Sequence, residues 1–227
     1  MMRRSGIFLA TLSAVCLFSV LAAAAPLKGT VVVPTNFKPA RDRHVTHWRV
    51  ENGVVPVAPP LRDPRTEMVV FLEGGKAPPL EKPPVAVMEI KGYRFDPFVV
   101  VVPAGGTVEF KNTGRVAHVI YDRQKVMSPG TVRPGETRKQ RYHAEGEYEI
   151  REEEFPHMKG IVKVLSTPLF AVPDEKGSFK MDNVPVGRWT VKVWYRGAII
   201  AQTTVDVGEK GSDVVVKVPE QQAQVGK

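Results

Sequence analysis

Cysteine is almost absent from this chain of 227 residues: the one cysteine, Cys16, lies in an apolar N-terminal segment. A single cysteine excludes an intramolecular disulfide, so the fold has to rest on its hydrophobic core. The usual signatures of hydrolases, zinc proteases and nucleotide-binding enzymes are also missing, because the sequence has no strand–GxSxG–helix pattern, no HExxH and no P-loop. We therefore expect a protein that is not an enzyme.

Long hydrophobic runs are lacking beyond the N-terminus. Two arginines precede the apolar run 7–21, and a cluster of alanines follows it, which is the pattern of a secretory signal peptide. The run is short for a membrane-spanning helix, so an uncleaved anchor is the less favoured alternative. We expect cleavage between Ala24 and Ala25, which makes residues 1–24 a signal peptide. The mature chain would then be periplasmic or secreted, with no integral membrane segment and no cysteine.

Acidic residues are outnumbered, since 32 lysines and arginines face 24 aspartates and glutamates, for a formal net charge of +8. The basic residues are scattered, and no run of them resembles a nucleic-acid-binding helix. A solvated basic surface is the favoured interpretation, with loose contact to anionic lipid or polysaccharide as the alternative. We expect no nucleic-acid partner.

Helical periodicity is missing from the mature chain, and short Val-rich segments separated by Gly and Pro predict an all-β protein of β-sandwiches. Residues Trp189, Val191, Val193 and Tyr195 alternate with Thr190, Lys192 and Trp194, which marks an inward face of a strand. The expected strands are 29–33, 68–72, 85–90, 98–102, 107–111, 116–121, 137–142, 147–151, 160–165, 178–181, 189–195, 199–207 and 213–218.

The middle of the chain carries the motifs of a known family. The stretch VVPAGGTVEFKN (residues 101–112), AHVIY (117–121) and FPHMKGIVKV (155–164) occur in order, and together they resemble the plastocyanin-like cupredoxins. The resemblance implies a cupredoxin-like β-sandwich at 85–166. Proteins of that family hold copper with two histidines, a cysteine thiolate and a weak axial methionine.

Laid on the family's C-x-x-H-P-x-M motif, this sequence keeps two of the four copper ligands. The resemblance places the first histidine on His118 and the axial methionine on Met158. The cysteine falls on Glu152 and the second histidine on Phe155. The resemblance therefore implies a degenerate site without blue-copper chemistry.

A second resemblance covers the flanks. Segments 170–179 and 183–191 are similar to a carboxypeptidase regulatory-like domain, a small transthyretin-like sandwich whose first strand would lie upstream near 29–33. The combination resembles methylamine-utilization-like periplasmic proteins. The expected organisation is as follows: 25–84, N-terminal strands and a basic, Pro-rich excursion belonging to the regulatory-like sandwich; 85–166, cupredoxin-like; 167–219, regulatory-like; 220–227, flexible tail.

The candidate metal ligands are His118, Glu152, His157 and Met158, as a weak or lost site. Glu152 shares strand parity with Tyr148 and Ile150, so one interpretation is a buried Glu152–His118 pair with Phe155 filling the place of the lost imidazole. The other is that Glu152 belongs to a solvated acidic loop tip. We expect no bound cofactor, with copper as the one candidate.

Three functional hypotheses follow from these features. The first is an exported, non-enzymatic binding or assembly module with a degenerate copper site. The second is a periplasmic copper-binding protein that uses a non-blue His/Met/Glu site. The third is an accessory subunit that docks to an electron-transfer partner. The sequence names neither the protein partner nor the extracellular ligand.

Overall fold

The structure, a computed structural model, describes residues 23–39, 63–75, 77, 80 and 82–220. Within these ranges the chain forms sixteen strands and one short 3-10 helix, η1 (Pro64–Glu67). Nowhere in this part of the chain does a helix have the length and apolar character that crossing a bilayer requires. Cys16, nearly all of the expected signal peptide, most of the basic excursion and the tail from 221 onward lie outside the described residues.

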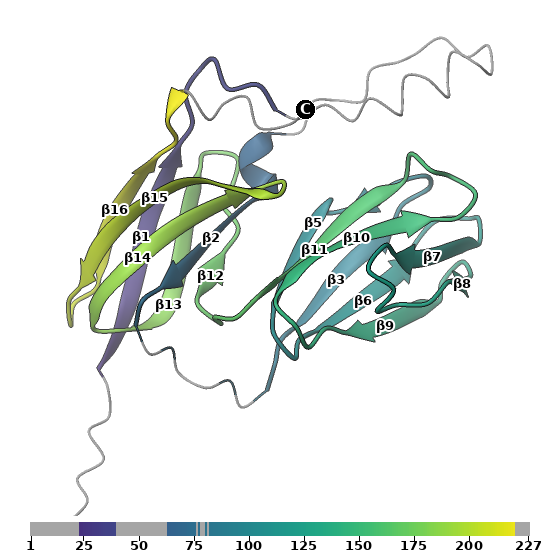
Figure 1. Ribbon diagram of the computed structural model, residues 1–227, viewed down its shortest axis with the longest axis horizontal. Coiled ribbons are helices and arrows are strands. Elements are labelled where there is room, and N and C mark those ends of the chain that lie inside the picture. Colours follow the sequence, from purple (N-terminus) through teal and green to yellow (C-terminus); the bar gives the residue numbers. More distant parts are fainter. Residues whose placement is uncertain (1–22, 40–62, 76, 78–79, 81, 221–227) are drawn as a thin grey trace, which may run out of the picture.

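Strands that follow one another in the chain form one sandwich, which we call the continuous sandwich (Figure 1). Its two sheets have the orders β5-β11-β10-β7-β8 and β4-β3-β6-β9. Its strands are β3 (Val85–Ile90), β4 (Phe95–Asp96), β5 (Val99–Pro103), β6 (Thr107–Asn112), β7 (His118–Asp122), β8 (Gly130–Val132), β9 (Thr137–Arg141), β10 (Gly146–Glu152) and β11 (Lys159–Leu165).

Strands from both ends of the chain form the other sandwich, which we call the split sandwich (Figure 1). Its sheets have the orders β13-β1-β16 and β12-β2-β14-β15. The strand nearest the N-terminus, β1, pairs antiparallel with β13 and parallel with β16, so it is the central strand of its sheet. The strands are β1 (Ala24–Val32), β2 (Met68–Glu73), β12 (Phe170–Ala171), β13 (Ser178–Pro185), β14 (Gly187–Tyr195), β15 (Ala198–Val207) and β16 (Ser212–Lys217).

The expected all-β class is confirmed, and each of the expected strands has a counterpart. The expected strand 85–90 matches β3, and the other boundaries differ by up to a few residues; the largest difference is at β1, which begins at Ala24 instead of residue 29. The sequence did not indicate β4, β8 and β12, which have two or three residues each. Strands this short contain too few residues for an alternating pattern to be recognised.

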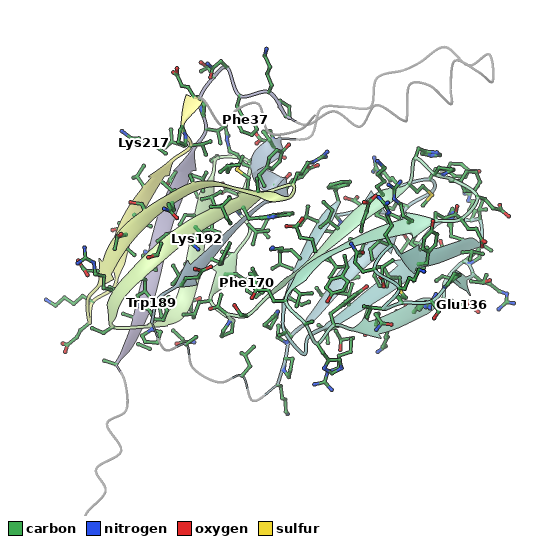
Figure 2. The ribbon with its side chains drawn as sticks, in the orientation of Figure 1. Phe37, Glu136, Phe170, Trp189, Lys192 and Lys217 are labelled. Atoms are coloured by element: carbon green, nitrogen blue, oxygen red, sulfur yellow. The ribbon has the colours of Figure 1, made fainter. Side chains whose placement is uncertain are left out.

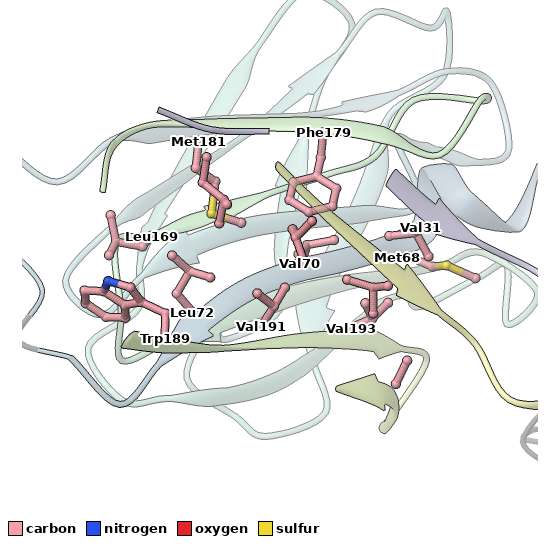
Figure 3. Close-up of a cluster of buried hydrophobic side chains, with 14 of the residues drawn as sticks. Val31, Met68, Val70, Leu72, Leu169, Phe179, Met181, Trp189, Val191 and Val193 are labelled. Atoms are coloured by element: carbon pink, nitrogen blue, oxygen red, sulfur yellow. The ribbon is translucent and has the colours of Figure 1, made fainter. Parts of the chain in front are cut away.

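Alternating side chains fill the core of the split sandwich. Leu72 and Val70 of β2 lie beside Val191 and Val193 of the neighbouring strand β14, and Phe179 and Met181 close the core from the opposite sheet (Figure 3). Gly29 of β1 is needed here, because an added Cβ would lie 2.4 Å from the Phe179 ring and 2.7 Å from the Val214 carbonyl oxygen. The glycine therefore lets a central strand run directly under an aromatic ring.

A third hydrophobic core joins the two sandwiches. It contains Val69 and Phe71 of β2, Trp194 of β14, and Val99, Val101 and Leu165 from the continuous sandwich. Strands β2 and β5 are consequently buried on both faces, which explains their uninterrupted apolar sequences MVVFL and VVVVP. The molecule thus stacks four β-layers, and Phe170 lies between the sandwiches in Figure 2.

Polar contacts accompany this third core. The indole Nε1 of Trp194 donates a hydrogen bond to Glu147 Oε1 at 2.7 Å, and Lys163 Nζ lies 5.3 Å from the centre of the Trp194 ring. The Arg196 guanidinium lies 4.3 Å from the centre of the Phe98 ring and pairs with Glu67 at 2.7 Å. Trp194 lies on the face opposite to the inward residues of its strand, and this face is the one that the continuous sandwich covers.

Candidate metal site

Two neighbouring strands bring His118 and Glu152 to the same face of a sheet. Strands β7 and β10 pair antiparallel with Glu152 opposite Ile120, so His118 is two positions away on the diagonal. Alternation along both strands points these side chains into the core of the continuous sandwich. A long side chain reaches its diagonal neighbour across an antiparallel pair. The register therefore places the carboxylate beside the imidazole.

The Glu152 carboxylate is held by backbone donors. Glu152 is 2% exposed. Its Oε1 accepts a hydrogen bond from the Val119 N–H at 3.1 Å, and its Oε2 accepts one from the Phe155 N–H at 2.5 Å. A buried anion requires such donors, because burial removes its hydration. Of the two interpretations of Glu152, the buried pair is the one the structure has, whereas Glu153 and Glu154 are exposed.

The His118 imidazole lies beside this carboxylate without a hydrogen bond. Its side chain has no exposed surface, and Nδ1 lies 3.5 Å from Glu152 Oε1. That separation is too long for a hydrogen bond of good geometry. Neither ring nitrogen of His118 has a hydrogen-bond partner within the described part of the chain. A buried imidazole with two unsatisfied nitrogens is costly and calls for an explanation.

Aromatic rings cover His118 on the solvent side. The Phe155 ring lies 6.0 Å from the His118 ring, and the Tyr93 ring lies 6.1 Å from it at a perpendicular angle. Tyr93 and Phe155 also contact each other, with ring centroids 4.8 Å apart. The sequence had indicated Phe155 as a filler of the site. Tyr93 was missed, since it lies in a short turn with no motif of its own.

The remaining candidate ligands lie on the turn that follows β10. Met158 is 1% exposed and belongs to the core of the continuous sandwich, and its N–H donates to the Phe155 carbonyl at 2.8 Å. His157 is half-buried, with its ring centroid 6.1 Å from that of Phe155. The turn therefore places Phe155 against both Met158 and His157.

Two further buried polar residues organise the neighbouring loops. Asn112 donates from Nδ2 to the carbonyls of Val116 and Val132 at 2.7 and 2.8 Å, and its Oδ1 accepts from the Gly114 N–H at 2.9 Å. The Asp122 carboxylate accepts hydrogen bonds from the backbone N–H groups that follow it, including that of Met127. Sequence reasoning missed both roles, because a polar residue at a strand end is ordinarily exposed.

A groove of about 620 Å³ lies next to this site, on the side of Glu152. Tyr121, Met127 and Pro156 line it, together with the Glu152 carboxylate and the basic side chain of Arg151. In the part of the chain that the structure describes, no three His, Cys, Asp or Glu side chains gather as a metal-binding group. His118 and Glu152 supply two such donors, and Met158 is the other candidate ligand that is buried.

No protein-family model matches the chain, and no curated protein matches it either. Among solved structures, the chain is similar to amicyanin from Paracoccus versutus (20% identity, 37% of this chain and 92% of amicyanin, TM-score 0.34). It is similar to a purple cupredoxin from Nitrosopumilus maritimus (23% identity, 35% and 98%, TM-score 0.33). A copper-containing nitrite reductase from Thermus scotoductus also matches (24% identity, 39% and 25%, TM-score 0.33). At these TM-scores the similarity assigns no function to the chain.

Proposed function

We propose that this chain is an exported, non-enzymatic copper-binding β-sandwich protein whose site uses His118, Glu152 and Met158 in place of a blue-copper ligand set. The observation that carries the proposal is the buried His118 imidazole, which faces a buried carboxylate and has no hydrogen-bond partner among the described residues. Export is supported by the leader pattern of residues 1–24.

The spacing of the two buried donors suits a shared cation. Two ligands that are each about 2.0 Å from one metal in tetrahedral geometry lie roughly 3.3 Å apart. The 3.5 Å between His118 Nδ1 and Glu152 Oε1 is close to that separation. It is also longer than a hydrogen bond between the same atoms would be. A cation between these two atoms would give His118 Nδ1 a partner, which it lacks among the described residues.

The donor set defines what copper would do here. Imidazole and carboxylate suit copper(II), and a thioether suits copper(I). Without a thiolate, the site lacks the short copper–sulfur bond that gives blue-copper proteins their strong colour and redox tuning. The chain's own residues hold the donors in place and exclude water, because His118, Glu152 and Met158 are all buried. These features support binding of copper, in preference to rapid electron transfer.

The hydrogen bonds of the Glu152 carboxylate support a site that is built around an anion at position 152. Two backbone N–H groups, from Val119 and Phe155, point at the position of residue 152. Donors in this arrangement stabilise any anion placed there.

We further propose that 85–166 is a cupredoxin-like domain and that 25–84 and 167–219 build a carboxypeptidase regulatory-like sandwich.

A second candidate function is a binding or assembly module that takes no metal. The partly buried Phe155 ring favours it, because this ring packs against His118 where the family motif places a second imidazole ligand. In that case the Glu152–His118 pair only fills space. An accessory subunit for an electron-transfer partner belongs to the same class and predicts that the partner co-purifies with the chain.

Metal analysis of the mature protein, purified from its native compartment without added copper, tests the proposal. We expect about one copper per chain, bound to the wild type and to a His143→Ala control, since His143 is exposed. His118→Ala should lower the affinity for copper by more than roughly 10–100-fold, which is the loss that removal of an outer-shell partner causes. Metal-free protein that also fails to take up copper(I) or copper(II) in titration would contradict the proposal and leave the assembly module.

A further inference from the structure

One exposed aromatic ring, that of Tyr93, packs against the buried His118 imidazole. Tyr93 is 52% exposed and contacts both His118 and Phe155, whereas the His118 side chain has no exposed surface. We propose that Tyr93 closes the His118 site and sets how fast metal ions and other reagents reach the imidazole. The part of this proposal that concerns metal ions rests on the function proposed above.

The turn that carries Tyr93 is fixed by its neighbours. The Lys91 N–H donates to the Arg94 carbonyl at 3.0 Å, which closes the turn around Tyr93. The adjacent loop abuts this turn, since a Cβ on Gly114 would lie 3.1 Å from the Gly92 nitrogen. Tyr93 is therefore placed by a packed scaffold and not by a free loop tip.

Asn112 connects that scaffold to the site's own sheet. Its buried amide makes three hydrogen bonds, one each with Gly114, Val116 and Val132. The next residue, Thr113, donates its N–H to the Ile90 carbonyl at 3.1 Å. These contacts tie the loop before His118 to the strand before Tyr93. The position of the Tyr93 ring is consequently coupled to the strand end that presents the imidazole.

The groove beside Glu152 offers no equivalent route. Its lining includes Glu152, but His118, His157 and Met158 are not among the residues that line it. The Glu152 carboxylate itself is engaged by the N–H groups of Val119 and Phe155. Of the two rings that contact His118, Phe155 is partly buried and Tyr93 is exposed, so Tyr93 is the ring that is freer to move.

The first experiment reads access without any metal. Mature metal-free protein is treated with diethyl pyrocarbonate, and modification of His118 is followed by mass spectrometry, with exposed His143 as the internal reference. In Tyr93→Ala the rate at His118 should rise about tenfold, which corresponds to about 1.4 kcal/mol of lost stabilisation of the closed state by the aromatic cover. Tyr93→Phe keeps the ring and should react like the wild type.

Two further variants separate closure from general loosening. Arg94→Ala changes the same turn and removes a side chain that pairs with Asp96. Because the Tyr93 ring remains, His118 should stay protected in this variant. Gly114→Ala pushes on Gly92 without changing a ring and should give an intermediate rate. An unchanged His118 rate in Tyr93→Ala, or an equal rise in Arg94→Ala, would overturn the proposal.

Copper distinguishes this proposal from the proposed function. In copper-loaded protein, Tyr93→Ala should speed removal of the metal by a chelator while leaving the stoichiometry unchanged. If the wild type binds no copper but His118 is modified faster in Tyr93→Ala than in the wild type, the closure by Tyr93 stands and the copper function is wrong. If copper binds and a chelator removes it at the same rate from the wild type and from Tyr93→Ala, the closure by Tyr93 is wrong and the copper function stands.

Discussion

The two sandwiches differ in how they draw their strands from the chain and in what they bury. The continuous sandwich uses residues 85–165 in unbroken order, whereas the split sandwich joins β1 and β2 with strands that begin after residue 169. The continuous sandwich buries four polar or charged side chains, namely Asn112, His118, Asp122 and Glu152. Within the described residues, no strand of the split sandwich buries a charged, amide or imidazole group.

This difference indicates that the two sandwiches contribute differently to the molecule. The core of the split sandwich consists of aliphatic and aromatic side chains, which stabilise it mainly through their burial. Buried polar groups cost stability unless they are satisfied, so their presence in the continuous sandwich makes this sandwich the place where we look for a site. The split sandwich contributes by covering the outer face of β5 and β11 through Val69, Phe71 and Trp194.

The largest effect is expected where the sandwiches meet. Trp194 is 1% exposed and donates to Glu147, so Trp194→Ala should cost about 3–5 kcal/mol of unfolding free energy. Because the third core would be lost, we expect the single urea transition of the wild type to separate into two, followed by fluorescence and circular dichroism. Trp194→Phe, which keeps apolar volume, should retain one transition. If fluorescence and circular dichroism still report one coincident unfolding transition in Trp194→Ala, Trp194 does not couple the two sandwiches.

A smaller effect is expected at the feature that only the continuous sandwich has. Glu152→Ala leaves the Val119 and Phe155 N–H groups and the His118 imidazole without the carboxylate, at a cost of about 1–3 kcal/mol. The matched control is Glu153→Ala, an exposed neighbour whose loss should change stability by less than about 0.5 kcal/mol. Equal values for the two variants in urea unfolding would remove the distinction between Glu152 and a surface residue.

The smallest effect concerns the Tyr142 hydroxyl, which is buried without a hydrogen-bond partner among the described residues. Burial, and secondarily the Asp122 charge, raises the pKa of Tyr142 well above its usual 10.0. The folded state then keeps a proton that the unfolded chain releases, so stability falls as pH rises above about 10. Tyr142→Phe should be neutral or stabilising by up to about 1 kcal/mol and should weaken this alkaline loss. A clear loss of stability near neutral pH would reveal a hydrogen bond at that hydroxyl.

Strands could be predicted from the sequence because alternation and Gly or Pro turns are local signals. Residues 189–195 are an example, since Trp189, Val191, Val193 and Tyr195 all face the core of the split sandwich. The role of Trp194 could not be predicted, because its partners Val99 and Val101 are about 95 residues away and no local pattern connects them. Only tertiary packing shows that β2 and β5 are covered on both faces.

The candidate site was predictable in part. Strand parity and the family motif placed Glu152 beside His118, and the structure has them in contact. Parity could not settle whether the carboxylate was buried, since Glu153 and Glu154 follow it and are exposed. Tyr93 and Asn112 were missed, because both act through loops that meet only in the folded molecule.

The central claim is that Glu152 and Phe155 occupy metal-ligand positions around His118, and restoring the missing ligands tests it most directly. The double variant Glu152→Cys, Phe155→His is loaded with copper(II), and its visible spectrum is recorded beside that of the wild type. We predict a strong orange-red absorption band in the variant and none in the wild type, because only the variant supplies a thiolate and two imidazoles. A variant that folds and binds copper without that band would contradict the account.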